Sequence, residues 1–170
     1  MFTIINVFPI FKKHFEMLKK DATSLILVIL YLFIPLGMSL ILIYEKLVLS
    51  PESIKTLITA FSIFTGFIIN VILIIFDIIK RSTKNRERIH EELIVHLYYN
   101  SLYELTISIF LLIFSLFSYF TYPKLNELCV TILSFILYFI LMNFLITLLQ
   151  ITKMIFVLLN KEIQLISSSS

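Results

Sequence analysis

The sequence predicts an all-α polytopic membrane protein, with four transmembrane helices, an N-terminal amphipathic helix and a cytosolic helical hairpin between spans two and three. Of the 170 residues, 59% are hydrophobic and 15% are charged, whereas soluble domains average about 45–50% and about 25%. The apolar residues gather in four uncharged stretches, and the charges lie between them. This composition indicates a single membrane domain, residues 1–170, without a separate soluble domain.

Each uncharged stretch is long enough to cross a bilayer, because a hydrocarbon core of about 30 Å needs about 20 helical residues. Helices are favoured over barrel strands, since the runs have helical length and the chain has only two glycines. Glu104 marks one boundary of span three, so no charged residue is expected at the bilayer centre. Pro35 predicts a kink in span one. The predicted spans cover about residues 22–44, 56–79, 104–122 and 128–152.

Lysine and arginine are distributed unevenly over the loops, which predicts the orientation. Of the 14 lysine and arginine residues, only Lys46, Lys55 and Lys124 lie in the first and third loops. The others lie in the N-terminal segment, the middle loop or the C-terminal end. We therefore expect a protein of the bacterial inner membrane with both termini in the cytosol. The first residues do not resemble a cleaved signal peptide, because their positive charges follow the apolar stretch.

The N-terminal segment is expected to form an amphipathic helix in the membrane interface. Phe8, Phe11, Phe15 and Leu18 fall on one helical face, and lysines lie opposite them. An apolar face of this kind inserts at the boundary between headgroups and acyl chains.

The middle loop, about residues 80–103, contains the most charged run of the chain, KRSTKNRERIHEELIVH. Its basic residues would hold the loop against anionic lipids. Lipid binding alone does not explain the glutamates between the basic residues, or the apolar residue at every fourth position. Two interpretations stay open: the loop is only a topology signal, or it is also a docking face. In both, we expect one helix from about Asn85 to Phe120. The predicted docking residues are Arg86, Arg88, Glu91, Glu92, Leu93 and Leu97.

No set of residues suited to catalysis or to holding a cofactor or metal is recognisable. His90 and His96 are six residues apart, which places them about 120° apart around a helix, whereas the zincin motif has histidines four apart on one face. Cys129 is the single cysteine, which excludes an internal disulfide and a Cys-x-x-Cys pair. We expect no enzyme activity, no cofactor and no direct binding of nucleic acid.

Polar residues at helical spacing line two of the spans. Small residues four apart let helices approach closely, and a buried amide can then bond across the contact. The same residues could line a polar path in an oligomer, and both interpretations stay open. The predicted helix-packing or pore-lining residues are Ser62, Gly66 and Asn70 in span two and Asn143, Thr147 and Gln150 in span four.

The chain combines four spans, almost no external loop and a charged helical segment, KRSTKNRERIHEELIVHLYYN. In this combination it resembles the small membrane proteins of bacterial antiphage systems. Among them it resembles the membrane subunit of the Kiwa system, the KwaA family. The resemblance covers the whole chain at the level of architecture. It implies a homo-oligomer, as a tetramer, that senses membrane disturbance and docks a cytosolic DNA-binding effector.

Two functions from different classes follow. The first is a non-enzymatic sensor and scaffold that oligomerises and recruits a cytosolic protein through the mixed-charge helix. The second is a pore-forming protein, either holin-like or a membrane-permeabilising immune effector, and it follows from the polar faces of spans two and four.

Overall fold

The computed structural model describes residues 6–21, 23–81 and 88–168, with side chains for residues 6–20, 23–77 and 92–160. Every regular element in these ranges is a helix. Four helical stretches are long and apolar enough to cross a membrane: Ser24–Tyr44, Pro51–Asp77, Glu92–Lys124 and Glu127–Asn160. The prediction of an all-α chain with four potential spans is therefore confirmed.

The first potential span combines three short elements, the second and fourth each lie within one long helix, and the third covers most of α5 and the short turn η2 after it. The elements in chain order are α1 (Phe8–Asp21), α2 (Ser24–Val28), the π-helical turn η1 (Ile29–Phe33), α3 (Ile34–Tyr44), α4 (Pro51–Arg81), α5 (Arg88–Thr121), the 3₁₀ turn η2 (Tyr122–Lys124) and α6 (Glu127–Ser168).

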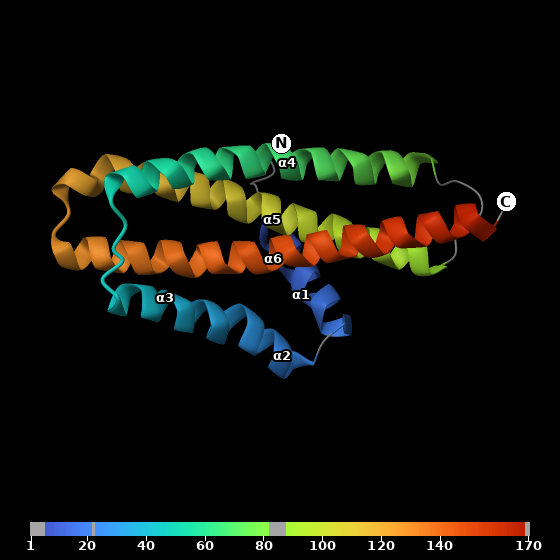
Figure 1. The fold of residues 1–170 in the computed structure, drawn as a ribbon, viewed down its shortest axis with the longest axis horizontal. Helices are drawn as coiled ribbons and strands as arrows, with labels where there is room; N and C mark the ends of the chain where they lie inside the picture. The colour runs from blue at the N-terminus through green and yellow to red at the C-terminus, as the bar shows by residue number, and fades with distance from the viewer. Residues whose placement is uncertain (1–5, 22, 82–87, 169–170) are drawn as a thin grey trace.

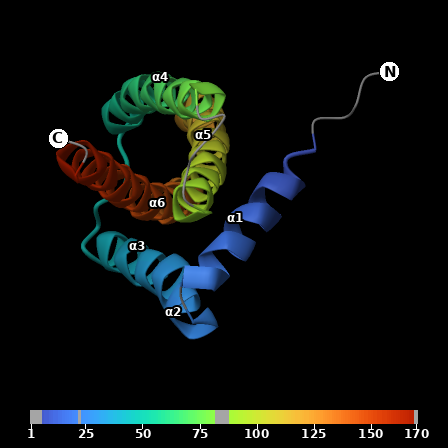
Figure 2. The ribbon, with the colours of Figure 1, turned by 90° about the vertical axis from the view of Figure 1, so that its right-hand side faces the viewer.

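The helices α4, α5 and α6 lie side by side along the long axis of the molecule (Figure 1). The end of the bundle that carries the loops at 45–50 and 122–126 is the short-loop end, and the opposite end, where α4 and α6 end and α5 begins, is the charged end. The helix α3 packs along α6, α2 lies against α1, and α1 crosses α5 obliquely (Figure 2).

The bundle core repeats every seven residues, as in a coiled coil. The ring of Phe61 on α4 meets that of Phe144 on α6 edge to face, with centroids 5.6 Å apart. On α5 the same spacing places Glu104 between Leu97 and Leu111, and all three are buried. The buried heptad positions are 54, 61, 68 and 75 on α4, 97, 104, 111 and 118 on α5, and 130, 137, 144, 151 and 158 on α6.

Serines allow α5 to approach its neighbours closely. Ser101, Ser108, Ser115 and Ser118 are fully buried along this helix, and Thr65 of α4 donates a hydrogen bond of 3.1 Å to Ser108. Small side chains of this kind are typical of close contacts between membrane helices. They explain why the pairing of α4 with α5 is the most extensive in the bundle.

The predicted long helix through the middle loop is present as α5, which is unbroken from Arg88 to Thr121. The turn of the predicted hairpin, at 82–87, lies outside the described residues. In span one Pro35 follows the π-helical turn η1, whose wider turn accommodates the missing backbone N–H. The hydroxyl of Ser39 donates to the carbonyl of Pro35 at 2.6 Å.

The helix α3 ends in a Schellman motif. The amide of Leu47 donates to the carbonyl of Leu42 and that of Lys46 to Ile43, both at 2.9 Å. The motif requires a left-handed residue after the helix, where glycine is usual. Here Lys46 occupies this position with φ of 58°.

Candidate functional site

A cluster of polar side chains lies inside the protein where α1 crosses α5 near α2 and α6. Helices in a membrane seldom bury groups of this kind unless the groups pack the helices together or serve function. We call it the polar cluster, and its members are His14, Tyr31, Asn100, Tyr103, Glu104, Thr147 and Gln150.

The side chain of His14 connects α1 to α5. It is fully buried, and its Nδ1 lies 2.8 Å from Oδ1 of Asn100. Since an amide oxygen only accepts, Nδ1 carries the proton. The imidazole also stacks on the ring of Tyr103, with centroids 3.8 Å apart and planes inclined by 3°. One residue thus anchors α1 by a hydrogen bond and by a ring contact.

The imidazole of His14 is neutral at physiological pH. Burial lowers its pKa from 6.5 to about 4, and the hydrogen bond to Asn100 offsets this only partly. With Nδ1 as the donor, Nε2 is an acceptor, and it has no hydrogen-bond partner among the described residues. A charged imidazole at this place would lose its contact with water, so protonation would disfavour the docked position of α1.

A second polar contact connects η1 to α6. The hydroxyl of Tyr31 donates to Oε1 of Gln150 at 2.7 Å. The nearby Thr147 is fully buried and donates to the carbonyl of Asn143 within its own helix. The Tyr31 hydroxyl thereby fixes the register of span one against span four.

Glu104 is the least expected member of the cluster. Its side chain is fully buried, and neither carboxyl oxygen has a hydrogen-bond partner among the described residues. It lies within electrostatic range of the phenols of Tyr31 and Tyr103. A carboxyl group in this setting is unfavourable, because a buried polar group without a hydrogen bond costs about 1–3 kcal/mol.

Glu104 lies inside the length that a membrane would cover. It is separated from the end of α5 at Thr121 by about 25 Å of helix, less than the hydrocarbon thickness of about 30 Å. The candidate span Glu92–Lys124 includes it, and Glu104 lies near the edge of that thickness that faces the charged end. A buried ionisable group inside a candidate span is a candidate functional residue.

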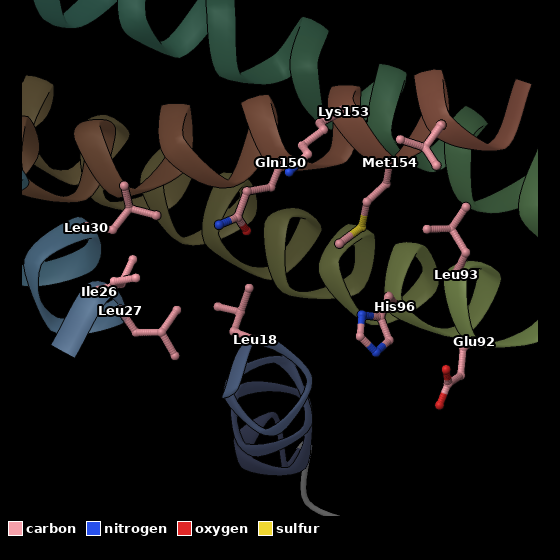
Figure 3. A pocket seen from close by; sticks show the side chains of 11 residues that line it. Leu18, Ile26, Leu27, Leu30, Glu92, Leu93, His96, Gln150, Lys153 and Met154 are labelled. Carbon is pink, nitrogen blue, oxygen red and sulfur yellow. The ribbon is translucent and has the colours of Figure 1, made fainter. Parts of the chain in front are cut away.

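A pocket of about 400 Å³ adjoins the polar cluster on the side of the charged end. It lies between α1, α2, α5 and α6 (Figure 3). Gln150 and Met154 belong to its wall, and Met154 also accepts a hydrogen bond from Asn100 at 3.3 Å. The pocket and the cluster are therefore in contact.

The predicted docking residues divide into three groups. Arg86 lies outside the described residues, and so do the side chains of Arg88 and Glu91. Glu92 is exposed and Leu93 is half-buried. Leu97 is 2% exposed and packs in the chain's own core with α4 and α6, so in this conformation it is not available to a partner.

The two sets of predicted packing residues lie in different environments. On α4, Ser62, Gly66 and Asn70 are all exposed, and a side chain at Gly66 would meet nothing within 4 Å. On α6, Asn143 and Thr147 are buried within the chain. The α6 set therefore packs the single chain, whereas the α4 set faces outward.

The expected amphipathic helix is present as α1. Its lysines are exposed, Phe11 and Phe15 are half-buried against α5, and Leu18 is buried, but Phe8 is 71% exposed. The sequence interpretation did not place His14 on the apolar face that it shares with Phe11 and Leu18. It also overlooked Glu104, although the seven-residue spacing from Leu97 to Leu111 could have revealed a core position.

Among the described side chains, no three histidine, cysteine, aspartate or glutamate residues come together as metal ligands would. The side chain of His90 lies outside this range. Comparisons of the chain with protein-family models, with curated proteins and with solved structures found no match.

Proposed function

We propose that the protein is a non-enzymatic membrane sensor and scaffold of a bacterial antiphage defence system, which self-associates and recruits a cytosolic effector at the charged end. The observation that carries this proposal is the length of α6. Its 42 residues span about 63 Å, roughly twice the hydrocarbon thickness of about 30 Å. Together with α4 and the start of α5 it forms a helical extension beyond the bilayer, large enough to hold a partner.

The orientation follows from charge. The charged end carries the middle loop and the C-terminal end, and with the N-terminal segment these hold all but three of the 14 basic residues. The positive-inside rule then places both termini and the helical extension in the cytosol. The antiphage setting follows from the resemblance in architecture to the Kiwa membrane subunit.

Sensing is assigned to α1. Its lysines face outward and suit contact with anionic lipids, whereas His14 on the other side contacts Asn100 and Tyr103 of α5. A disturbance of the lipid surface that displaces α1 would remove His14 from its stack and open the polar cluster to water. The same helix α5 continues to the charged end at Arg88, so the change reaches the docking face.

Self-association is assigned to the outward face of α4. Asn70 is exposed within the candidate span Pro51–Asp77, where lipid offers its amide no hydrogen bond. Gly66 has open space beside it, which allows a second helix to approach closely. A tetramer assembled through this face would leave α5 and α6 to pack within each chain.

A pull-down from native membranes in mild detergent tests the proposal. The four-residue reversal Arg86→Glu, Arg88→Glu, Glu91→Lys and Glu92→Lys keeps the net charge, and Glu52→Lys with Lys55→Glu is the matched control at the short-loop end. We expect the wild type and the control to retain one stoichiometric cytosolic protein that the reversal loses. An oligomer without a partner in all three would refute recruitment.

The pore remains the second candidate, because the exposed Ser62, Gly66 and Asn70 could line a path between several copies. Membrane potential measured on induced expression, with and without phage, separates the two. A loss of potential that Asn70→Leu abolishes would favour the pore, and an unchanged potential excludes it.

A further inference from the structure

One side chain of α5 connects three helices. The amide oxygen of Asn100 lies 2.8 Å from Nδ1 of His14 on α1, and its amide nitrogen donates to Sδ of Met154 on α6 at 3.3 Å. Asn100 is fully buried, so both ends of its amide are occupied within the chain. The sulfur of Met154 is therefore two hydrogen bonds away from the helix to which sensing is assigned.

Met154 determines which way the amide of Asn100 points. A thioether sulfur accepts hydrogen bonds but donates none, so the NH₂ group must face Met154 and the oxygen must face His14. The oxygen then accepts from Nδ1 of His14, which is the contact that anchors α1. A change at the sulfur that moves the amide therefore weakens the hold on α1.

The sulfur of Met154 is also accessible. Its side chain extends from α6 into the pocket beside the polar cluster, and Leu18 of α1 reaches toward the same space from the other side (Figure 3). The pocket has a volume of about 400 Å³, and its wall also includes His96 and the exposed Glu92. Met154 itself is only half-buried. A small oxidant such as hydrogen peroxide can enter here from the charged end.

Among the five methionines of the chain, Met142 is the natural comparison for Met154. Both lie on α6 and both are half-buried, but Met142 is about 18 Å of helix nearer the short-loop end. It is not part of the pocket wall. Susceptibility to oxidation follows exposure, so the pocket distinguishes the two sulfurs.

We propose that Met154 is an oxidation site and that its sulfoxide releases α1. Hydrogen peroxide transfers one oxygen atom to the sulfur and leaves as water, so the thioether loses two electrons and the peroxide gains them. Sδ and Nδ2 of Asn100 are 3.3 Å apart, whereas an N–H···O bond alone takes about 2.9 Å, so an oxygen cannot lie in line between them. Asn100 must give way or Met154 must turn into the pocket, and the present contact is lost in both cases.

The release is reversible, because sulfoxide reductases return methionine sulfoxide to the thioether. The inference rests on the assignment of sensing to α1 in the proposed function, and it adds an oxidant to the disturbances that displace this helix. It does not require a docked effector, so the purified chain is sufficient to test it.

Peptide mass spectrometry and hydrogen exchange of the full chain in nanodiscs, before and after treatment with hydrogen peroxide, test the proposal. Met17 lies on α1 itself and is replaced by leucine in every protein tested. We expect Met154 to be oxidised faster than Met142. The α1 amides should then exchange about fivefold faster, the factor that corresponds to one hydrogen bond. Met154→Leu should abolish this response to peroxide, and Met142→Leu, the matched control, should keep it.

Oxidation of Met154 that is no faster than that of Met142 would overturn the access through the pocket, and the proposal with it. Unchanged exchange of α1 after Met154 is oxidised, or a response that persists in Met154→Leu, would overturn the link through Asn100. Leucine and methionine have similar volumes, so the variants should keep the helical content of the wild type, and circular dichroism verifies this. No partner is present in the assay, so its outcome is independent of effector recruitment.

Discussion

Replacing Glu104 with leucine should make the protein more stable. The carboxyl group occupies a heptad core position between Leu97 and Leu111, and it is fully buried without a hydrogen-bond partner among the described residues. A leucine at this position continues the apolar repeat of α5. Most substitutions of buried residues destabilise a protein, so a gain here is a discriminating outcome.

The magnitude follows from the unpaired carboxyl group. Leaving a buried polar group without its hydrogen bonds costs about 1–3 kcal/mol, and the leucine removes that cost. No hydrophobic gain is added, because lipid tails are as apolar as leucine. We therefore expect Glu104→Leu to raise the free energy of unfolding by about 2 kcal/mol. Glu104→Gln, which keeps the shape and the polar atoms, should be nearly neutral.

Denaturant titration in detergent, followed by far-UV circular dichroism, measures the change. The chain contains no tryptophan, so helical content is the convenient signal. The matched control is Leu111→Glu, which places a second carboxyl group one heptad away and should destabilise. A loss of about 3 kcal/mol or more for Glu104→Leu would contradict the reasoning, because it is the cost of breaking a buried ionic contact. If Glu104 has a functional role, the stabilised variant loses recruitment of the effector.

Three further outcomes are expected. Because burial lowers the pKa of His14 to about 4, the docking of α1 is fully stable above pH 6.5, and its free energy falls by up to about 3 kcal/mol between pH 6.5 and pH 4. Hydrogen exchange of the α1 amides measures this loss of docking stability. If the loss persists in His14→Phe, His14 is not its source. Lys46→Gly should raise the free energy of unfolding by about 1 kcal/mol, since glycine has no penalty at positive φ, and thermal unfolding that shows no gain would refute it. In a double-mutant cycle, Tyr31→Phe and Gln150→Leu should couple by about 0.6 kcal/mol, and additive losses would mean that their hydrogen bond does not contribute.

The helix α5 was predictable from the sequence, because its pattern runs from the charged middle loop into the third potential span without a glycine or proline. Charge suggested a span from about Glu104 within a helix that begins near Asn85, and the structure shows this helix from Arg88. Glu92 is exposed, whereas Glu104 is buried, so the two glutamates differ in environment and not in residue type. The neighbours of a charged residue, and not its charge, decide whether it is buried.

The sequence by itself determined the helical class, the four potential spans, the charge asymmetry between the two ends and the amphipathic nature of α1. These properties depend on composition and on spacing within one helix. Only the tertiary structure decided which faces are covered. His14 meets Asn100 across 86 positions, and Tyr31 meets Gln150 across 119. The physical reason is that lipid and protein interior are equally apolar, so hydrophobicity cannot tell the buried face of α6 from the outward face of α4.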